Sequence, residues 1–330
     1  MIGAMDFPVY PLVFKPAYKD YVWGGSRIGS AFGRQGVPPI CAESWELSAH
    51  PDGLSRVATG ALAGLSLADL TLCHGAALVG ARAPDPTRFP LLFKLIDARD
   101  RLSVQVHPNA ATAAQHGGEP KTEMWVVLDS EPGAFIHVGL KPGVGPDDLR
   151  RALETKQAGD CLNTLAVQAG DAILIPGGLV HAIGAGCLIY EVQQNSNTTY
   201  RLYDWDRLGS DGRPRPLHVA EALAVIDWTL PAPKLLREDP AGTAVNVWHD
   251  VLSSPFFRMR RIRLEHSETV IRDSGSFQAL FVHSGTASAT INGVTVPLPC
   301  GTSCLIPAAA SRCTIRADEP ANLLLTTLPV

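Results

Sequence analysis

The sequence lacks any long run of charge of one sign. Its 330 residues contain 28 Lys and Arg against 32 Asp and Glu, which gives a formal net charge of −4. No group of lysines and arginines forms a basic stripe that could follow a phosphate backbone, so nucleic acid is not expected as a partner. With 46% hydrophobic and 18% charged residues, the composition is also far from that of disordered chains.

Paired cysteines and targeting segments are missing as well. The seven cysteines are odd in number, include no C-x-x-C pair and lie mostly in apolar stretches, which favours buried thiols in a reducing cytoplasm. The opening residues MIGAMDFPVY have no basic region and no continuous apolar run, so we expect no secretory signal. The uncharged segment 172–190 contains Pro176, four glycines and His181, and we interpret it as two buried strands with no membrane span.

The chain does contain many short strand signals. They are rich in β-branched residues and are bounded by Gly, Pro, Asn and Asp; in the first half they cover residues 89–98, 102–107, 123–129, 171–176 and 187–193. Closely spaced strands of this kind are typical of antiparallel sandwiches and barrels. Helical periodicity is limited to residues 146–156 and 218–228, which we expect to decorate a mainly β core.

A proline-rich segment divides these strands into two groups. Residues 229–243 contain three prolines and no hydrophobic periodicity, so we predict a linker there. One spacing recurs on its two sides, formed by Gly170, Pro176 and His181 in the first half and by Gly301, Pro307 and Arg312 in the second. This repeat predicts two β-barrels built on one plan, of which only the first keeps its histidine.

Three short patterns contain candidate metal ligands. In LSVQVH, strand alternation places Ser103, Gln105 and His107 on one face. Lys121 and Glu123 share a face of the next strand. His181 ends the spacing G-x5-P-x-G-x2-H, which resembles the second motif of the cupin barrels.

Each pattern has an ordinary explanation when taken alone. The first could be a half-exposed strand, the second a surface ion pair of little consequence, and the third a histidine of the core. Together they give two imidazoles, a carboxylate and an amide oxygen, a mixed set that zinc accepts and that leaves positions open for catalysis. Two histidines and one carboxylate also fit the Fe(II) oxygenases, so the ligands leave the metal open.

The chain resembles the type I phosphomannose isomerases, especially their short bacterial form. The resemblance spans most of residues 10–210 and is carried by the segments ESWELSAHPDG, FPLLFKLIDA, LSVQVHP, PKTEMW, GDAILIPGGLVHAIG and YEVQQNSNTTYRLYDWDR. It implies two cupin barrels: a catalytic domain at 1–235 with helical insertions at about 141–165 and 217–228, and a degenerate barrel at 236–330 without metal ligands. It also implies one Zn²⁺ per chain, bound by Gln105, His107, Glu123 and His181.

The same resemblance implies an aldose–ketose isomerase of mannose metabolism. Such an enzyme interconverts mannose 6-phosphate and fructose 6-phosphate, and moves a proton between C2 and C1 through a cis-enediol. Arg201 and Lys121 are then the expected catalytic residues. The expected substrate-binding residues are Lys94, Ser103, Glu191 and Asn197.

Two departures from the family pattern leave the base of the proton transfer open. Asn197 stands where many members have Asp, and Pro120 stands where some have His; neither side chain can act as a base. The remaining candidates are a water on the metal, Lys121 with a lowered pKa, and Glu191.

Two other functions stay open at this point. The His, Glu, His set also suits an Fe(II)-dependent cupin oxygenase, and the two barrels could instead form a non-catalytic sugar-phosphate-binding bicupin. We expect a small-molecule sugar phosphate as the ligand, no nucleic acid and no membrane, and either a monomer or a homodimer.

Overall fold

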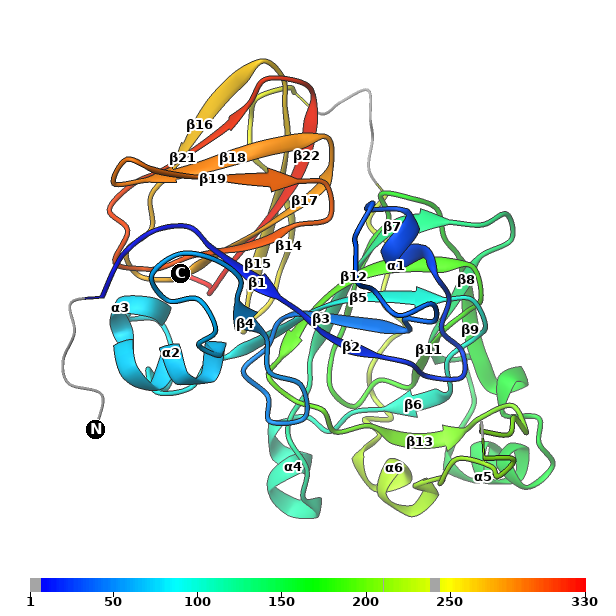
Figure 1. Cartoon of the computed structure of the whole chain (residues 1–330). Helices are drawn as coiled ribbons and strands as arrows, with labels where there is room; N and C mark the ends of the chain where they lie inside the picture. The colour runs from blue at the N-terminus through cyan, green and yellow to red at the C-terminus, as the bar shows by residue number, and fades with distance from the viewer. Residues whose placement is uncertain (1–6, 210, 238–243) are drawn as a thin grey trace.

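The protein is built mainly from antiparallel β-strands. The structure, a computed structural model, describes residues 7–209, 211–237 and 244–330, and in these ranges the strands form four sheets that make up two barrels (Figure 1). The prediction of a mainly β protein with two barrels of one kind and few helices is confirmed.

The first barrel combines a six-stranded and a five-stranded sheet. Its strands are β2 (Ala17–Lys19), β3 (Glu43–Leu47), β5 (Leu91–Ala98), β6 (Val104–Val106), β7 (Glu123–Ser130), β8 (Phe135–Leu140), β9 (Leu162–Ala166), β10 (Ala172–Ile175), β11 (His181–Ile183), β12 (Cys187–Gln194) and β13 (Tyr200–Tyr203). The sheet orders are β10-β7-β12-β5-β3-β2 and β13-β6-β11-β8-β9. The uncharged segment 172–190 holds β10, β11 and the start of β12, so it has one strand more than expected.

The second barrel combines a seven-stranded and a four-stranded sheet. Its strands are β1 (Leu12–Lys15), β4 (Arg56–Val57), β14 (His249–Ser253), β15 (Arg258–Leu264), β16 (Ser267–Ile271), β17 (Gln278–Ser284), β18 (Thr286–Ile291), β19 (Val294–Pro299), β20 (Ser303–Ile306), β21 (Cys313–Ala317) and β22 (Ala321–Thr327). The sheet orders are β14-β15-β22-β17-β20-β1-β4 and β16-β21-β18-β19.

The two barrels repeat one pattern of strand pairing. Strands β5 to β12 correspond in order to β15 to β22, and each pairing in the first set has its counterpart in the second: β5·β12 and β15·β22, β7·β12 and β17·β22, β7·β10 and β17·β20, β6·β11 and β16·β21, β8·β11 and β18·β21, β8·β9 and β18·β19. The sequence repeat around Pro176 and Pro307 therefore marks the same turn of two equivalent barrels.

The helices are short and lie outside the barrels. They are α1 (Arg27–Ser30), α2 (Leu67–His74), α3 (Ala76–Val79), α4 (Ala110–His116), α5 (Pro146–Glu154), α6 (Val219–Val225) and a 3-10 turn at Ala158–Cys161. As expected, α5 begins at a proline and has two aspartates in its first turn. No helix in the described ranges is long and apolar enough to cross a membrane.

The second predicted helix is shorter than expected. It was predicted to reach residue 228, but α6 ends at Val225 and Ile226 turns to an extended ψ of 128°. The cause is local, because the Asp227 carboxylate accepts hydrogen bonds from the backbone N–H and hydroxyl of Thr229 at 3.0 and 2.6 Å and so favours a turn. The other predicted helical insertion, at about residues 141–165, is also shorter than expected. Strand β9 begins at Leu162, so the helical residues of this insertion lie before it.

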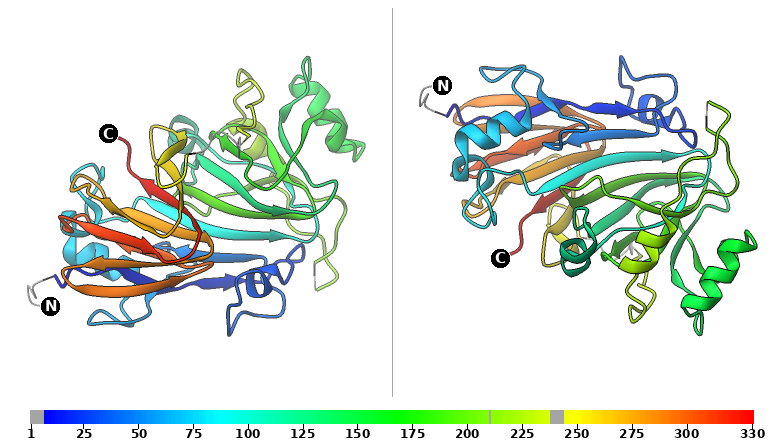
Figure 2. Two further views of the ribbon diagram at one scale, coloured as in Figure 1. Left: turned by 90° about the horizontal axis from the view of Figure 1, so that it is seen from above. Right: turned by 90° about the horizontal axis from the view of Figure 1, so that it is seen from below.

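The N-terminal segment contributes strands to both barrels. Strand β1 pairs with β20 (Leu12 with Leu305), whereas β2 pairs with β3 in the first barrel (Figure 2). The division into domains at 1–235 and 236–330 stays a prediction, and the sheet of the second barrel includes strands from before that boundary. Of the predicted linker, residues 238–243 lie outside the described residues.

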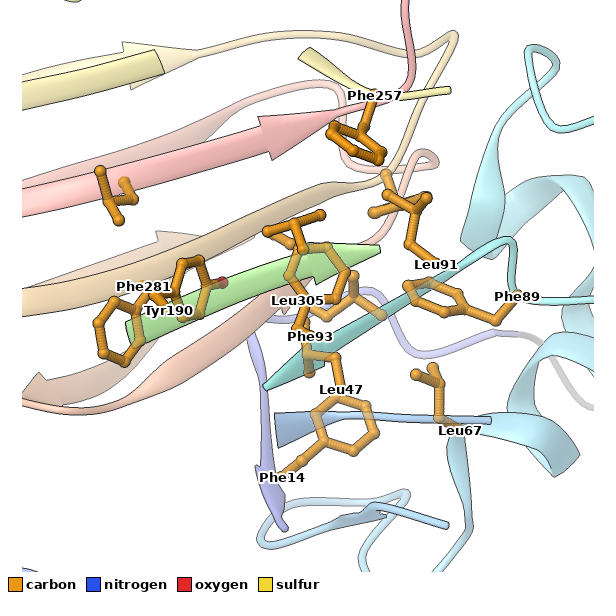
Figure 3. Close-up of a cluster of buried hydrophobic side chains, with 14 of the residues drawn as sticks. Phe14, Leu47, Leu67, Phe89, Leu91, Phe93, Tyr190, Phe257, Phe281 and Leu305 are labelled. Atoms are coloured by element: carbon orange, nitrogen blue, oxygen red, sulfur yellow. The ribbon is translucent and has the colours of Figure 1, made fainter. Parts of the chain in front are cut away.

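One hydrophobic core joins the two barrels. The ring of Tyr190 on β12 stacks on Phe281 of β17, with centroids 4.4 Å apart and an interplanar angle of 13°, and both side chains are fully buried (Figure 3). Leu305 of β20, Phe93 of β5 and Phe14 of β1 belong to the same cluster. The barrels therefore share the apolar surface that stabilises them.

We expect the substitution Phe281→Ala to lower the free energy of unfolding by about 3–5 kcal/mol, because it leaves a cavity in the hydrophobic core that joins the two barrels. Urea denaturation should show one transition shifted to lower denaturant. Val294→Ala on β19, where the side chain is 47% exposed, is the control and should change stability by less than about 0.5 kcal/mol. Independent transitions for the two barrels would contradict a shared core.

Candidate metal centre and active site

The two facing sheets of the first barrel supply the predicted metal ligands. His107 directly follows β6 and His181 begins β11 in one sheet, while Glu123 begins β7 in the other. All three side chains are at most 1% exposed. The turn before β11 fixes their approach, because Gly178 adopts a φ of 94° and its N–H donates to the carbonyl of His107 at 2.7 Å.

Glu123 lies between the two imidazoles. Its Oε2 is 3.4 Å from Nε2 of His107, and its Oε1 is 3.3 Å from Nε2 of His181. One ligand atom from each of the three residues lies within 4.8 Å of the other two. The structure thus brings together three residues that span 74 positions of the chain, from His107 to His181, with their donor atoms close together.

The backbone holds both imidazoles in the form that binds a metal. Nδ1 of His107 is 2.8 Å from the carbonyl of Thr198, and Nδ1 of His181 is 2.8 Å from the carbonyl of Leu179, so both Nδ1 atoms carry the proton and donate it. Each Nε2 then carries a lone pair on the side of Glu123, and the lone pair of His107 also lies 3.2 Å from the Lys121 ammonium. Burial lowers the pKa of His107 to about 3 and also lowers that of His181, so both rings are neutral near pH 7.

The chemistry of this donor set fits a divalent cation. Both carboxylate oxygens of Glu123 are buried and accept no hydrogen bond from the described residues. Burial alone would raise the pKa of Glu123, but the Lys121 ammonium, 2.7 Å from Oε2, holds it well below its ordinary value. The Lys121 ammonium compensates Oε2, whereas Oε1 faces the lone pair of His181 Nε2 at 3.3 Å and accepts no hydrogen bond from the described residues, which is costly unless a further cation lies between them.

Gln105 lies beside the triad. It is the cross-strand neighbour of His181, and its side-chain amide nitrogen is 3.3 Å from Nε2 of that histidine. The oxygen and nitrogen of an amide are assigned from their surroundings, so a half-turn of this group would direct Oε1 at the same point.

A buried network of lysines and glutamates adjoins the triad. Lys94 Nζ lies 3.4 Å from Glu43 Oε2 and 3.5 Å from Glu191 Oε1, and Lys121 Nζ lies 3.8 Å from the same Glu191 oxygen. Burial alone would lower the pKa of Lys94, but Glu43 and Glu191 raise it, so this ammonium stays charged. The indole N–H of Trp125 donates to Glu191 Oε2 at 2.9 Å, whereas Oε1 accepts no hydrogen bond from the described residues.

These groups border one cavity of about 250 Å³ next to the triad. Arg201 lines it, and its guanidinium donates from Nε to the Ser103 hydroxyl at 3.2 Å and from Nη1 to the carbonyl of Pro216 at 2.8 Å. Asp204 and Asp206, the carboxylates that might have bound Arg201, pair with Arg207, Arg215 and Lys156 instead.

All the expected catalytic and substrate-binding residues meet at this cavity. Its lining includes Lys94, Ser103, Lys121, Glu191, Asn197 and Arg201. Asn197 lies at an edge of the cavity, where its amide donates to Asp52 Oδ2 at 2.7 Å and its backbone N–H donates to Glu119 Oε2 at 3.0 Å.

Two further charged residues line the cavity that the sequence patterns do not single out, Glu43 and Arg215. Glu43 opens a segment that carried the family resemblance, ESWELSAHPDG, and its burial next to a lysine could have been suspected from that. Arg215 lies in an irregular segment between β13 and α6 that has no periodic pattern, so no signal in the sequence identifies it.

Comparisons with known proteins point in one direction. The model of the type I phosphomannose isomerase catalytic domain matches residues 12–128. The mannose-6-phosphate isomerase of Streptococcus mutans is 37% identical over 261 residues, which cover 78% of this chain and 80% of the relative.

Solved structures agree with these matches. The crystal structure of the mannose 6-phosphate isomerase from Bacillus subtilis has a TM-score of 0.82 at 28% identity, and the match covers 96% of this chain and 99% of that one. A mannose 6-phosphate isomerase structure bound with zinc and yttrium shares the fold, with a TM-score of 0.68 at 19% identity over 97% of this chain and 100% of that one.

We expect Glu123→Gln and His181→Ala each to lower zinc affinity by at least about 100-fold. Loss of a residue that only supports a metal ligand costs up to about 100-fold, and loss of a ligand itself should cost at least as much. Metal content after dialysis, measured by atomic emission, tests this. The control is His137→Gln, since His137 is a buried histidine of β8 outside the cluster. Equal metal content in wild type and Glu123→Gln would refute the site.

Proposed function

This chain belongs to the type I phosphomannose isomerase family, and we propose on that premise that it interconverts mannose 6-phosphate and fructose 6-phosphate with the help of zinc. The observation that carries the proposal is the convergence of His107, Glu123 and His181 beside a cavity lined by lysines and arginines. An oxygenase needs no such set of cations, whereas a sugar phosphate does.

The metal would be held by Gln105, His107, Glu123 and His181. Nitrogen and oxygen donors in this ratio suit zinc, which has no redox chemistry and would supply an electrophile for the carbonyl and hydroxyl oxygens of the sugar. The neutral imidazoles and Oε1 of Glu123, which accepts no hydrogen bond from the described residues, support this assignment.

Glu191 is our proposal for the base that moves the proton between C1 and C2. Glu191 lines the cavity, its buried Oε1 accepts no hydrogen bond from the described residues, and its Oε2 is anchored by Trp125. Burial raises the pKa of Glu191 above its ordinary value, and the charge of Glu123 adds to the rise, so the carboxylate is a stronger base than one in water.

Lys121 and Lys94 are less suited to take up that proton. Glu43 and Glu191 raise the pKa of Lys94 against the effect of its burial, and the Lys121 ammonium is ion-paired with Glu123 at 2.7 Å. Charged lysines at this place can stabilise negative charge on the sugar oxygens as the cis-enediol forms. Arg201 and Ser103 would bind the remainder of the substrate, and Asn197 would contact it from the edge of the cavity.

The compartment and the assembly remain proposals from the sequence. All seven cysteines are free, and we propose a reducing cytoplasm. We propose either a monomer or a homodimer.

A coupled assay tests the function directly. Purified protein loaded with zinc should produce fructose 6-phosphate from mannose 6-phosphate, and removing the metal with a chelator should abolish turnover until zinc is returned. Oxygen uptake that depends on substrate and on bound iron would favour the oxygenase. Absence of isomerisation by zinc-loaded protein would refute the proposed substrate.

The role of Glu191 predicts a selective loss of kcat. Glu191→Gln keeps the shape and the acceptor for Trp125, and should lower kcat by about 10²–10⁴-fold, the usual contribution of a general base. Metal content should not change. The wild-type activity should fall as the pH drops through the raised pKa of this carboxyl group, because only the ionised form accepts a proton.

Lys121→Met is the companion variant for this experiment. If Glu191→Gln kept kcat within tenfold of wild type while Lys121→Met lost the acid limb of the pH profile, the base would be the lysine.

A further inference from the structure

Two arginines line the cavity, and one of them, Arg201, is the cross-strand partner of Gln105. Arg215 lines the same cavity as Arg201 and Ser103, and its side chain is 20% exposed. It follows β13 by 12 residues and precedes α6. Nothing in the reasoning about the metal or the base requires this residue.

The two lysines of the cavity have little positive charge to spare. Lys94 lies against Glu43 and Glu191, and Lys121 lies 2.7 Å from Glu123. Two ammonium groups thus face three carboxylates, so both lysines are already paired. A phosphate, which carries a charge of about −1.5 to −2 at neutral pH, finds no unpaired lysine in this part of the cavity.

Arg201 and Arg215, which line the cavity and are here called the arginine wall, have the reverse balance. Asp204 is buried and binds two arginines: Arg215, from Nε at 2.7 Å and Nη2 at 2.5 Å, and Arg207 from Nη2 at 2.7 Å. Arg201 forms no ion pair among the described residues, and the like charge of Arg215 is, after burial, the next cause that lowers its pKa. Two guanidinium groups therefore share the buried Asp204 carboxylate, Arg207 also pairs with the half-exposed Asp100, and Arg201 adds a third positive charge without an ion pair among the described residues.

Donor groups on this wall remain available. No hydrogen bond among the described residues uses Nη1 of Arg215 or Nη2 of Arg201. The Ser103 hydroxyl oxygen accepts from Arg201, so its O–H is left to donate. Guanidinium groups and hydroxyls are the donors that bind phosphate oxygens most strongly.

We propose that Arg215 binds the phosphate of the substrate together with Arg201 and Ser103, and that Asp204 orients Arg215 for this contact. The assignment rests on the proposed function for the identity of the substrate. It orients the sugar phosphate in the cavity, with the phosphate at the arginine wall and C1 and C2 at the wall that carries Glu191 and the metal ligands. Lys94 then contacts the sugar and not its phosphate.

The test is the binding of inorganic phosphate, measured by calorimetry on the purified protein without turnover. Arg215→Gln should weaken phosphate binding by at least about tenfold, as expected for the loss of one charge-assisted contact. The zinc-loaded variant should show a rise in KM for mannose 6-phosphate of similar size, and kcat should fall by less. Arg215→Lys keeps the charge beside Asp204 and should give an intermediate affinity.

The matched control is Arg213→Gln, because Arg213 is exposed on the same segment and the substitution removes the same charge. It should leave phosphate affinity within about twofold of wild type, since exposed charges at a distance are screened by salt. Melting temperatures show whether each variant folds. If Arg215→Gln fails to fold, the phosphate affinity of Arg215→Lys tests the proposal instead. Unchanged phosphate affinity in Arg215→Gln, equal losses in both variants, or no phosphate binding by wild type would overturn the proposal.

This experiment separates the proposal from the proposed function. A protein that does not isomerise mannose 6-phosphate but loses phosphate binding on Arg215→Gln would keep the phosphate subsite and reject the substrate. An active isomerase whose phosphate affinity is unchanged by Arg215→Gln would keep the proposed substrate and reject the phosphate subsite.

Discussion

The site depends on the burial of three carboxylates inside one barrel. Glu43, Glu123 and Glu191 are all less than 9% exposed, and an ionised carboxylate in such a place costs several kcal/mol unless it is compensated. The compensation comes from neighbouring strands, since Lys94 is the cross-strand partner of Glu191, and the indoles of Trp45 and Trp125 donate to Glu43 and Glu191. The two lysines balance only two of the three carboxylates. The remaining negative charge is a physical reason for a cation at the histidines.

The second barrel shows what the same strand pairing does without these charges. Its interior is filled by aliphatic side chains and by the thiols of Cys304 and Cys313. Arg312, at the position that corresponds to His181, is exposed. This barrel cannot offer the same ligands, but it holds β1 through β20 and packs Phe281 against Tyr190, directly behind the strand that carries Glu191. Its contribution is a shared hydrophobic core behind β12.

Local patterns in the sequence were enough for the centre of the site but not for its surroundings. Alternation in LSVQVH placed Gln105 and His107 on one face, and the proline–glycine spacing identified His181, because both are short-range consequences of backbone geometry. Strand β1 pairs with a strand almost 300 residues away, from Leu12 to Leu305, and no local signal encodes that. Arg215 was missed for the same reason, since its place is set by Asp204 and not by periodicity.

The central claim is that two imidazoles and the Glu123 carboxylate hold one zinc ion. X-ray absorption at the zinc edge measures this coordination directly. The account predicts nitrogen and oxygen donors at about 2.0–2.2 Å, two of them histidines, and no sulfur, with the histidine scattering lost in His181→Ala. Zinc bound through cysteine sulfur, or with histidine scattering unchanged in that variant, would contradict it.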